Sequence, residues 1–85
     1  NYAYTPSPAV AALRRSAALV GEQKTEDALK TLEAALPTTK DETLRQLMLL
    51  RAARAELILG RHDAALARLA GVDLAGYVAL RDELR

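Results

Sequence analysis

The sequence predicts an all-α fold, built as a short array of about five helices in antiparallel hairpins with the last hairpin incomplete. Apolar residues make up 51% of the 85 positions, but only three residues are aromatic, and all three are tyrosines. Alanine, leucine and valine must therefore form the core. Apolar residues also recur at helical spacing along the chain, and one short motif recurs 37 residues after its first appearance.

Composition and charge exclude several classes of function. Twelve basic and eleven acidic residues give a net charge of +1, whereas nucleic-acid binders usually carry a clustered basic excess. A helix-turn-helix nucleic-acid binder is therefore a disfavoured alternative. No cysteine is present, and the lone His62 cannot make a metal site without several carboxylates nearby, so we expect it to pack in a helical turn. Without a phosphate-binding glycine loop or a serine beside a base, the sequence predicts neither an enzyme nor a cofactor site.

Two helices are predicted in the first part of the chain, after a tail over residues 1–7. Ser7 as the cap and Pro8 in the first turn mark the start of a helix that runs to about Glu22, closed with the help of Gly21. The second helix begins at Thr25, which we also interpret as a cap, and has acidic residues in its first turn, where the helix dipole favours anions. Pro37 stops it, so the first hairpin spans residues 8–36.

Three further helices are predicted. Thr39 and Glu42 have capping-box spacing, and the third helix continues from there to Leu59, before Gly60. A fourth helix follows over residues 62–70, which completes a second hairpin over 40–70. A fifth helix over 74–85 would be the first helix of a third hairpin. The tail and the array therefore divide the chain into residues 1–7 and 8–85.

The repeat itself indicates stacked hairpins. Residues 26–32 (EDALKTL) align with residues 63–69 (DAALARL), which places Ala28 over Ala65 at an offset of 37. A period in the thirties is typical of helical-hairpin arrays, in which each hairpin buries its apolar face on the next.

The run Gly60-Arg-His-Asp-Ala-Ala-Leu resembles the middle of a tetratricopeptide repeat (TPR). In that repeat a glycine ends the first helix and a small residue five positions later permits a close helix contact. Gly60 and Ala65 fit those places, whereas in the first unit Ala28 fits and Gln23 stands at the glycine position. The resemblance implies a right-handed α-solenoid fragment that binds other proteins.

A narrower resemblance lies in residues 41–54 (DETLRQLMLLRAAR), 63–69 and 76–85 (GYVALRDELR), which look like the YfgM-like family. This family is the ancillary subunit of the bacterial SecYEG translocon. The resemblance implies a membrane anchor outside this fragment, a domain on the periplasmic side of the inner membrane, and translocon subunits or periplasmic chaperones as partners. We expect the chain to be an inner fragment that lacks both the anchor and the last hairpin.

The first helix of each hairpin should line the partner-binding groove of such an array. The residues that repeat position assigns to this groove are Val10, Leu13, Ala17, Val20, Leu47, Leu50, Arg54 and Leu57. A helix or an unfolded segment could lie on this mostly apolar surface. The alternative is that these side chains only pack on neighbouring helices. Because Arg54 is the one cation among them, the groove does not suit the clamp that some TPR proteins use for a C-terminal carboxylate.

Two alternatives concern partners. Arg51 and Arg54 each lie in an apolar stretch, so each either extends from the core to water or awaits an anionic partner. The chain could also be a generic TPR-like adaptor or a self-associating scaffold unconnected with secretion, since an unpaired fifth helix could take its partner from a second copy.

Overall fold

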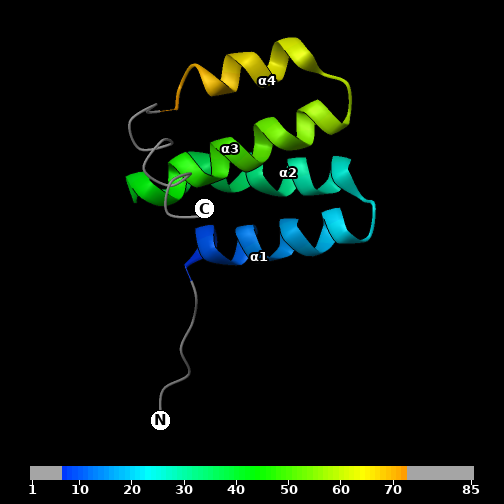
Figure 1. Cartoon of the computed structure of the whole chain (residues 1–85). Coiled ribbons are helices and arrows are strands. Elements are labelled where there is room, and N and C mark those ends of the chain that lie inside the picture. Colours follow the sequence, from blue (N-terminus) through cyan, green and yellow to red (C-terminus); the bar gives the residue numbers. More distant parts are fainter. Residues whose placement is uncertain (1–6, 73–85) are drawn as a thin grey trace, which may run out of the picture.

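The computed structural model describes residues 7–72, and four α-helices lie within them. They are α1 (Pro8–Gly21), α2 (Thr25–Ala35), α3 (Glu42–Ile58) and α4 (His62–Leu69), with a short 3₁₀ turn, η1 (Leu36–Thr38), after α2. Successive helices run antiparallel and form two stacked hairpins (Figure 1). The predicted all-α array of hairpins is confirmed. Residues 1–6 of the predicted tail and the predicted fifth helix over 74–85 lie outside the described residues.

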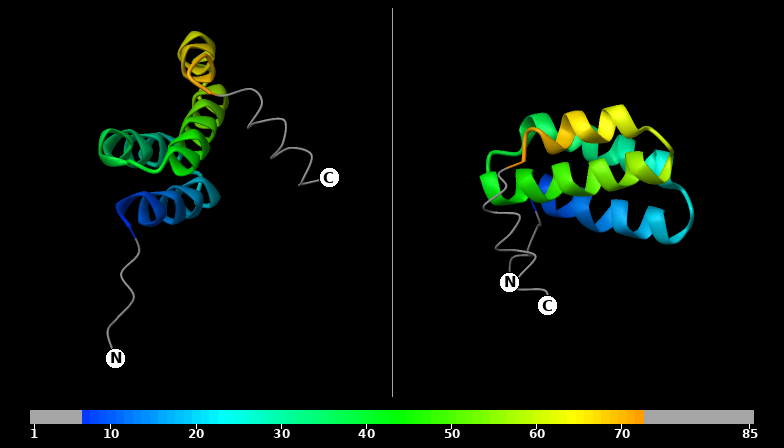
Figure 2. Two further views of the ribbon diagram at one scale, coloured as in Figure 1. Left: turned by 90° about the vertical axis from the view of Figure 1, so that its left-hand side faces the viewer. Right: turned by 45° about the horizontal axis from the view of Figure 1, so that its top comes forward.

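Helix α3 is the centre of the array. It contacts α1, α2, η1 and α4, and the end-on view shows α1 and α2 on one side of it and α4 on the other (Figure 2). A helix that is apolar around most of its girth needs neighbours on several sides, and α3 has them. The buried cluster comes from three helices: Ala9, Ala12, Leu13, Leu29, Leu32, Met48, Ala52 and Ala55. Half of these are alanines, which let the helix axes approach closely.

Both hairpins turn through the same left-handed backbone motif. Gln23 has a φ of 63° and Gly60 a φ of 79°, and the two residues occupy equivalent positions at the repeat offset. In each turn the next backbone N–H donates a 2.8 Å hydrogen bond to the carbonyl five residues earlier, from Lys24 to Leu19 and from Arg61 to Glu56. This is the Schellman closure of a helix. The offset of 37 is thus a repeat of backbone conformation as well as of sequence.

The closure of α1 corrects one prediction. Gly21 is the last residue of the helix, and the left-handed residue is Gln23 two positions later. The predicted last residues of the four helices also each lie one position too far. Those residues are the C-caps, whose backbone N–H groups still donate to carbonyls of the last helical turn although the residues lie outside the helix: Glu22, Leu36, Leu59 and Ala70.

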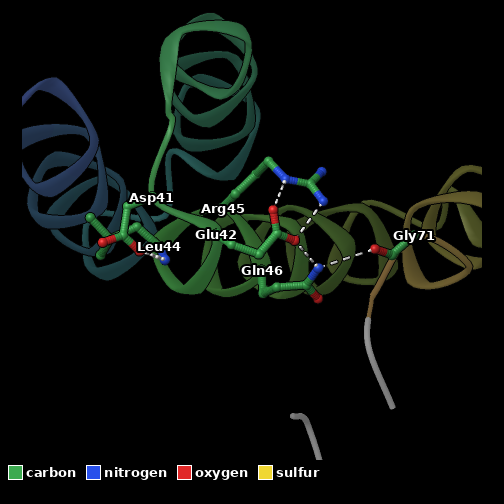
Figure 3. A network of polar contacts seen from close by, with 6 residues as sticks. All are labelled: Asp41, Glu42, Leu44, Arg45, Gln46 and Gly71. Carbon is green, nitrogen blue, oxygen red and sulfur yellow. Dashed lines mark hydrogen bonds and ion pairs between the residues drawn. The ribbon is translucent and has the colours of Figure 1, made fainter. Parts of the chain in front are cut away.

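The N-cap of α3 is Asp41, so the predicted capping box at Thr39 is wrong. The Asp41 carboxylate accepts a 3.0 Å hydrogen bond from the backbone N–H of Leu44 (Figure 3). Thr39 instead donates its hydroxyl to the carbonyl of Ala35 at 2.8 Å, and its oxygen lies 3.4 Å from the sulfur of Met48. Thr39 therefore links the end of the first hairpin to the core residue Met48.

Of the other two predicted N-caps, one forms and one does not. Ser7 caps α1 as predicted, accepting a 3.3 Å hydrogen bond from the N–H of Val10. Thr25 does not cap α2, because it is the first helical residue and Lys24 occupies the cap position without a side-chain bond. Pro37 lies inside η1, where a proline in the first turn loses no required hydrogen bond.

A polar network joins the start of α3 to the end of α4. Arg45 donates to both carboxylate oxygens of Glu42, at 3.1 and 2.8 Å, and Gln46 donates to one of them at 2.7 Å (Figure 3). These hydrogen bonds, first from Arg45 and then from Gln46, lower the pKa of Glu42 to about 2. The Gln46 amide also lies 3.4 Å from the carbonyl oxygen of Gly71.

Ion pairs link the second helices of the two hairpins. Arg61 pairs with Glu26, and Arg68 pairs with Glu33. Glu26 and Glu33 are seven residues apart on α2, so they lie on one face of that helix. Arg61, at the N-cap of α4, and Arg68, within α4, are also seven residues apart and lie on one face. The hydrogen bond from Arg61 holds the pKa of Glu26 below its usual value.

Candidate partner-binding pocket

A pocket of about 310 Å³ opens between α1, α2 and α3. This volume is at the lower end of the range of about 300–1,000 Å³ that small ligand sites occupy. Nine of the described residues line it: Ser16, Ala17, Val20, Ala28, Leu32, Arg51, Arg54, Ala55 and Ile58. Every one of the three helices contributes, so the pocket is a product of their packing.

Small side chains create the hollow. Ser16, Ala17, Ala28 and Ala55 leave space where larger residues would bring the helices into contact. The hydroxyl of Ser16 donates to the carbonyl of Leu13 at 2.9 Å, so this buried polar group is satisfied within its own helix. Apolar groups remain partly in water around the hollow, because Val20 is 40% exposed and Ile58 is 56% exposed. The pocket therefore offers apolar surface to a partner.

Two arginines supply the charge of the pocket. Arg51 donates to the carbonyl oxygen of Leu13 at 3.3 Å, a contact that joins α3 to α1. Arg54 makes no hydrogen bond or ion pair among residues 7–72, and it is exposed. No acidic residue is among the nine lining residues, and neither arginine has a carboxylate partner in the part of the chain that the structure describes.

The structure brings together three of the eight predicted groove residues, namely Ala17, Val20 and Arg54. Leu13 is 7% exposed and belongs to the core, because α1 turns this position toward α2 and α3. The other four lie away from the pocket lining: Val10, Leu47 and Leu50 are half-buried, and Leu57 is 47% exposed. That the groove binds a partner stays a prediction.

Sequence reasoning missed six lining residues. Arg51, Ala55 and Ile58 share a face of α3 with Arg54, at spacings of three and four residues, and this spacing could have found them. Ser16 is the neighbour of a predicted residue. Ala28 and Leu32 come from α2, which repeat position does not place in a groove.

The described residues also bear on His62, metal binding and membrane spans. His62 is exposed at the start of α4, so the expectation that it packs in the turn is wrong. Within residues 7–72, no three His, Cys, Asp or Glu side chains gather to hold a metal ion. None of the helices described is long and apolar enough to cross a membrane.

A family model described as a tetratricopeptide repeat-like domain matches residues 1–85. The chain belongs to the tetratricopeptide repeat-like family. The broad resemblance is thereby confirmed, while the match does not single out the YfgM-like proteins. Neither the comparison with curated proteins nor that with solved structures gave a match.

The tetratricopeptide repeat-like assignment fits what the pocket can do. Domains of this family are generally non-catalytic modules that bind proteins. The pocket combines apolar side chains with two guanidinium groups, which are hydrogen-bond donors. Such a surface can hold an apolar group and an anion of a partner.

Proposed function

We propose that this chain is a non-catalytic protein-protein interaction module that binds a segment of a partner protein in the pocket between α1 and α3. The observation that carries the proposal is Arg54, an arginine without a partner among the described residues, next to an apolar hollow. Concave apolar sites with a few polar groups are the usual form of a binding site. The family to which the chain belongs supports the same role.

The resemblance of residues 41–54, 63–69 and 76–85 to YfgM-like proteins supports a narrower proposal. In it, the chain is part of an accessory protein of the SecYEG translocon, held at the bacterial inner membrane by an anchor outside this sequence. The domain faces the periplasm, and its partners are translocon subunits or periplasmic chaperones.

A second candidate is a generic adaptor or self-associating scaffold unconnected with secretion. The observation that favours it is Leu66 on α4, which is 64% exposed although its repeat equivalent, Leu29, is 2% exposed. Leu29 is covered by the following hairpin, whereas the same face of α4 has no such cover among residues 7–72. A second copy could supply it.

Photocrosslinking from the pocket tests these proposals. A photoreactive residue placed at Val20 or Ile58 samples the pocket mouth and keeps both arginines. The matched control is Lys30, which is exposed on α2 and is not among the lining residues. The crosslinks are formed in intact bacterial membranes and identified by mass spectrometry.

The narrower proposal predicts that translocon or periplasmic chaperone subunits are crosslinked from Val20 and Ile58 but not from Lys30. Crosslinks only between copies of the chain would favour the scaffold. Equal yields from all three positions, or none from the pocket positions, would contradict binding in the pocket.

A further inference from the structure

We propose that the pocket recognises an acidic segment of a partner protein, in which one apolar side chain enters the hollow and neighbouring carboxylates bind Arg51 and Arg54. This inference deepens the proposed function and rests on it. It names the chemistry of the partner, which neither the family match nor the repeat pattern specifies.

The first argument is the separation of paired from unpaired arginines. Arg45, Arg61 and Arg68 each hold at least one glutamate. The four arginines of α1 and the middle of α3 hold none among the described residues: Arg14, Arg15, Arg51 and Arg54. Paired guanidinium groups thus lie on the α4 side and at the start of α3, and unpaired ones lie along α1 and the α3 segment that borders it.

The second argument is the lack of an internal competitor for these charges. Helix α1 contains no acidic residue at all. Beyond the first turn of α3, its one acidic residue is Glu56. Glu56 is 4% exposed and already accepts a hydrogen bond from Arg68. On α2, Glu26 and Glu33 pair with Arg61 and Arg68, and no acid of α2 lines the pocket. Among residues 7–72, no carboxylate would therefore have to be displaced by an acidic ligand at the pocket.

The geometry of the two pocket arginines suits carboxylates. Arg51 and Arg54 are one helical turn apart, so their side chains leave the same face of α3. The bond from Arg51 to the Leu13 carbonyl uses one of five N–H donors and holds the side chain beside α1. A guanidinium with free parallel donors binds a carboxylate through two hydrogen bonds, which adds geometric selectivity to charge attraction.

The apolar part of the pocket favours a peptide over a nucleic acid. Val20, Leu32 and Ile58 line the hollow, and a partner gains from it only by inserting an apolar side chain. None of the nine lining residues is aromatic, so the pocket lacks the flat side chains on which nucleic-acid bases stack. The net charge of +1 also provides little of the long-range attraction on which nucleic-acid binding depends.

Fluorescence anisotropy with defined peptides tests the inference on the whole 85-residue chain. The probe is a short labelled peptide with one leucine flanked on both sides by glutamates. One matched peptide replaces the glutamates with glutamines, and another replaces the leucine with serine. We expect the glutamate peptide to bind about tenfold more tightly than either, because each variant loses charge-assisted hydrogen bonds or apolar burial.

The chain offers matched variants for the same assay. Arg54→Gln should weaken the glutamate peptide about tenfold and leave the glutamine peptide unchanged. Lys30→Gln removes one positive charge away from the pocket and should change neither affinity. Because Arg51 also contacts Leu13, Arg51→Gln is compared only after its circular dichroism spectrum and unfolding midpoint match those of the parent chain.

Three results would overturn the inference: equal binding of the glutamate and glutamine peptides, equal loss with Arg54→Gln and Lys30→Gln, or full displacement of the peptide by a single-stranded oligonucleotide of equal charge. Failure of this inference can be distinguished from failure of the proposed function, which would show as no crosslink from either pocket position. If Val20 crosslinks to a partner through a segment without acidic residues, the interaction module stands and the acidic preference falls.

Discussion

Arg68 on α4 donates a 2.7 Å hydrogen bond from Nε to the buried carboxylate of Glu56 on α3, and it also pairs with Glu33 on α2. The Glu56 side chain is only 6% exposed, whereas Leu19 occupies the equivalent buried position of the first hairpin. A buried ion pair thus replaces an apolar contact in the second repeat.

Removal of Arg68 should be strongly destabilising. Arg68→Leu leaves a buried carboxylate without its counterion, and breaking such a pair lowers the free energy of unfolding by about 3 kcal/mol. In the double variant with Glu56→Leu, the free energy of unfolding should be only about 1 kcal/mol below that of the parent chain. The reason is that a buried leucine then occupies position 56, as Leu19 does at the equivalent position of the first hairpin. Urea denaturation of the single and double variants measures both values. Simple additivity of the two changes would contradict the coupling.

Exchanges between glutamine and glycine at the two left-handed turn positions should have opposite effects on stability. Gln23→Gly should raise the free energy of unfolding by about 1 kcal/mol, because only glycine adopts a φ of 63° without steric strain. Gly60→Gln should lower it by about 1 kcal/mol, although a side chain at this position has open space around it. Thermal unfolding of the two variants checks the signs. A stabilising Gly60→Gln would show that the turn is not held in this conformation.

Leu29 and Leu66 are repeat equivalents that should respond differently to the same truncation. Leu29→Ala removes a side chain that is 2% exposed and should lower the free energy of unfolding by about 3 kcal/mol. Leu66→Ala, at 64% exposure, should change it by less than about 0.5 kcal/mol. Urea denaturation at a low and a high protein concentration makes the comparison. A large loss at Leu66 that appears only at the high concentration would support the self-associating scaffold.

Because of the network at the start of α3, the free energy of unfolding should depend on pH in the acidic range. The folded-state pKa of Glu42 is lowered to about 2, while an unfolded glutamate titrates near about 4.3. Because the pKa is lowered on folding, this contribution is complete above about pH 4.3 and is lost as the pH falls toward about 2. Glu26, whose pKa is lowered by Arg61, acts in the same direction.

Urea unfolding at a series of pH values between those limits measures this effect. Glu42→Gln should flatten the decline in stability, and Arg45→Gln should flatten it as well, because it removes the main cause of the lowered pKa. An unchanged slope in both variants would contradict the role of the network.

The sequence by itself determined the helices, their order and the repeat. These features depend on interactions within a few residues, such as the Ser7 cap, the Gly60 turn and the periodic apolar stripe. The errors were local as well. Thr39 and Asp41 are both acceptable caps two residues apart, and Thr39 was recruited by the carbonyl of Ala35 and the sulfur of Met48. The contacts of Thr39 with the end of the first hairpin and with the core thus distinguish two caps that the local sequence allows equally.

Only the tertiary structure decided the pocket and the ion pairs between hairpins. Helical periodicity identifies an apolar stripe, but the crossing of the helices determines which of its members are covered, as Leu13 in the core and Ala17 at the pocket illustrate. The contribution of Ala28 and Leu32 to the pocket, and the pairing of Glu56 with Arg68, join residues on different helices. Such contacts depend on how whole elements pack, and no spacing within one helix contains that information.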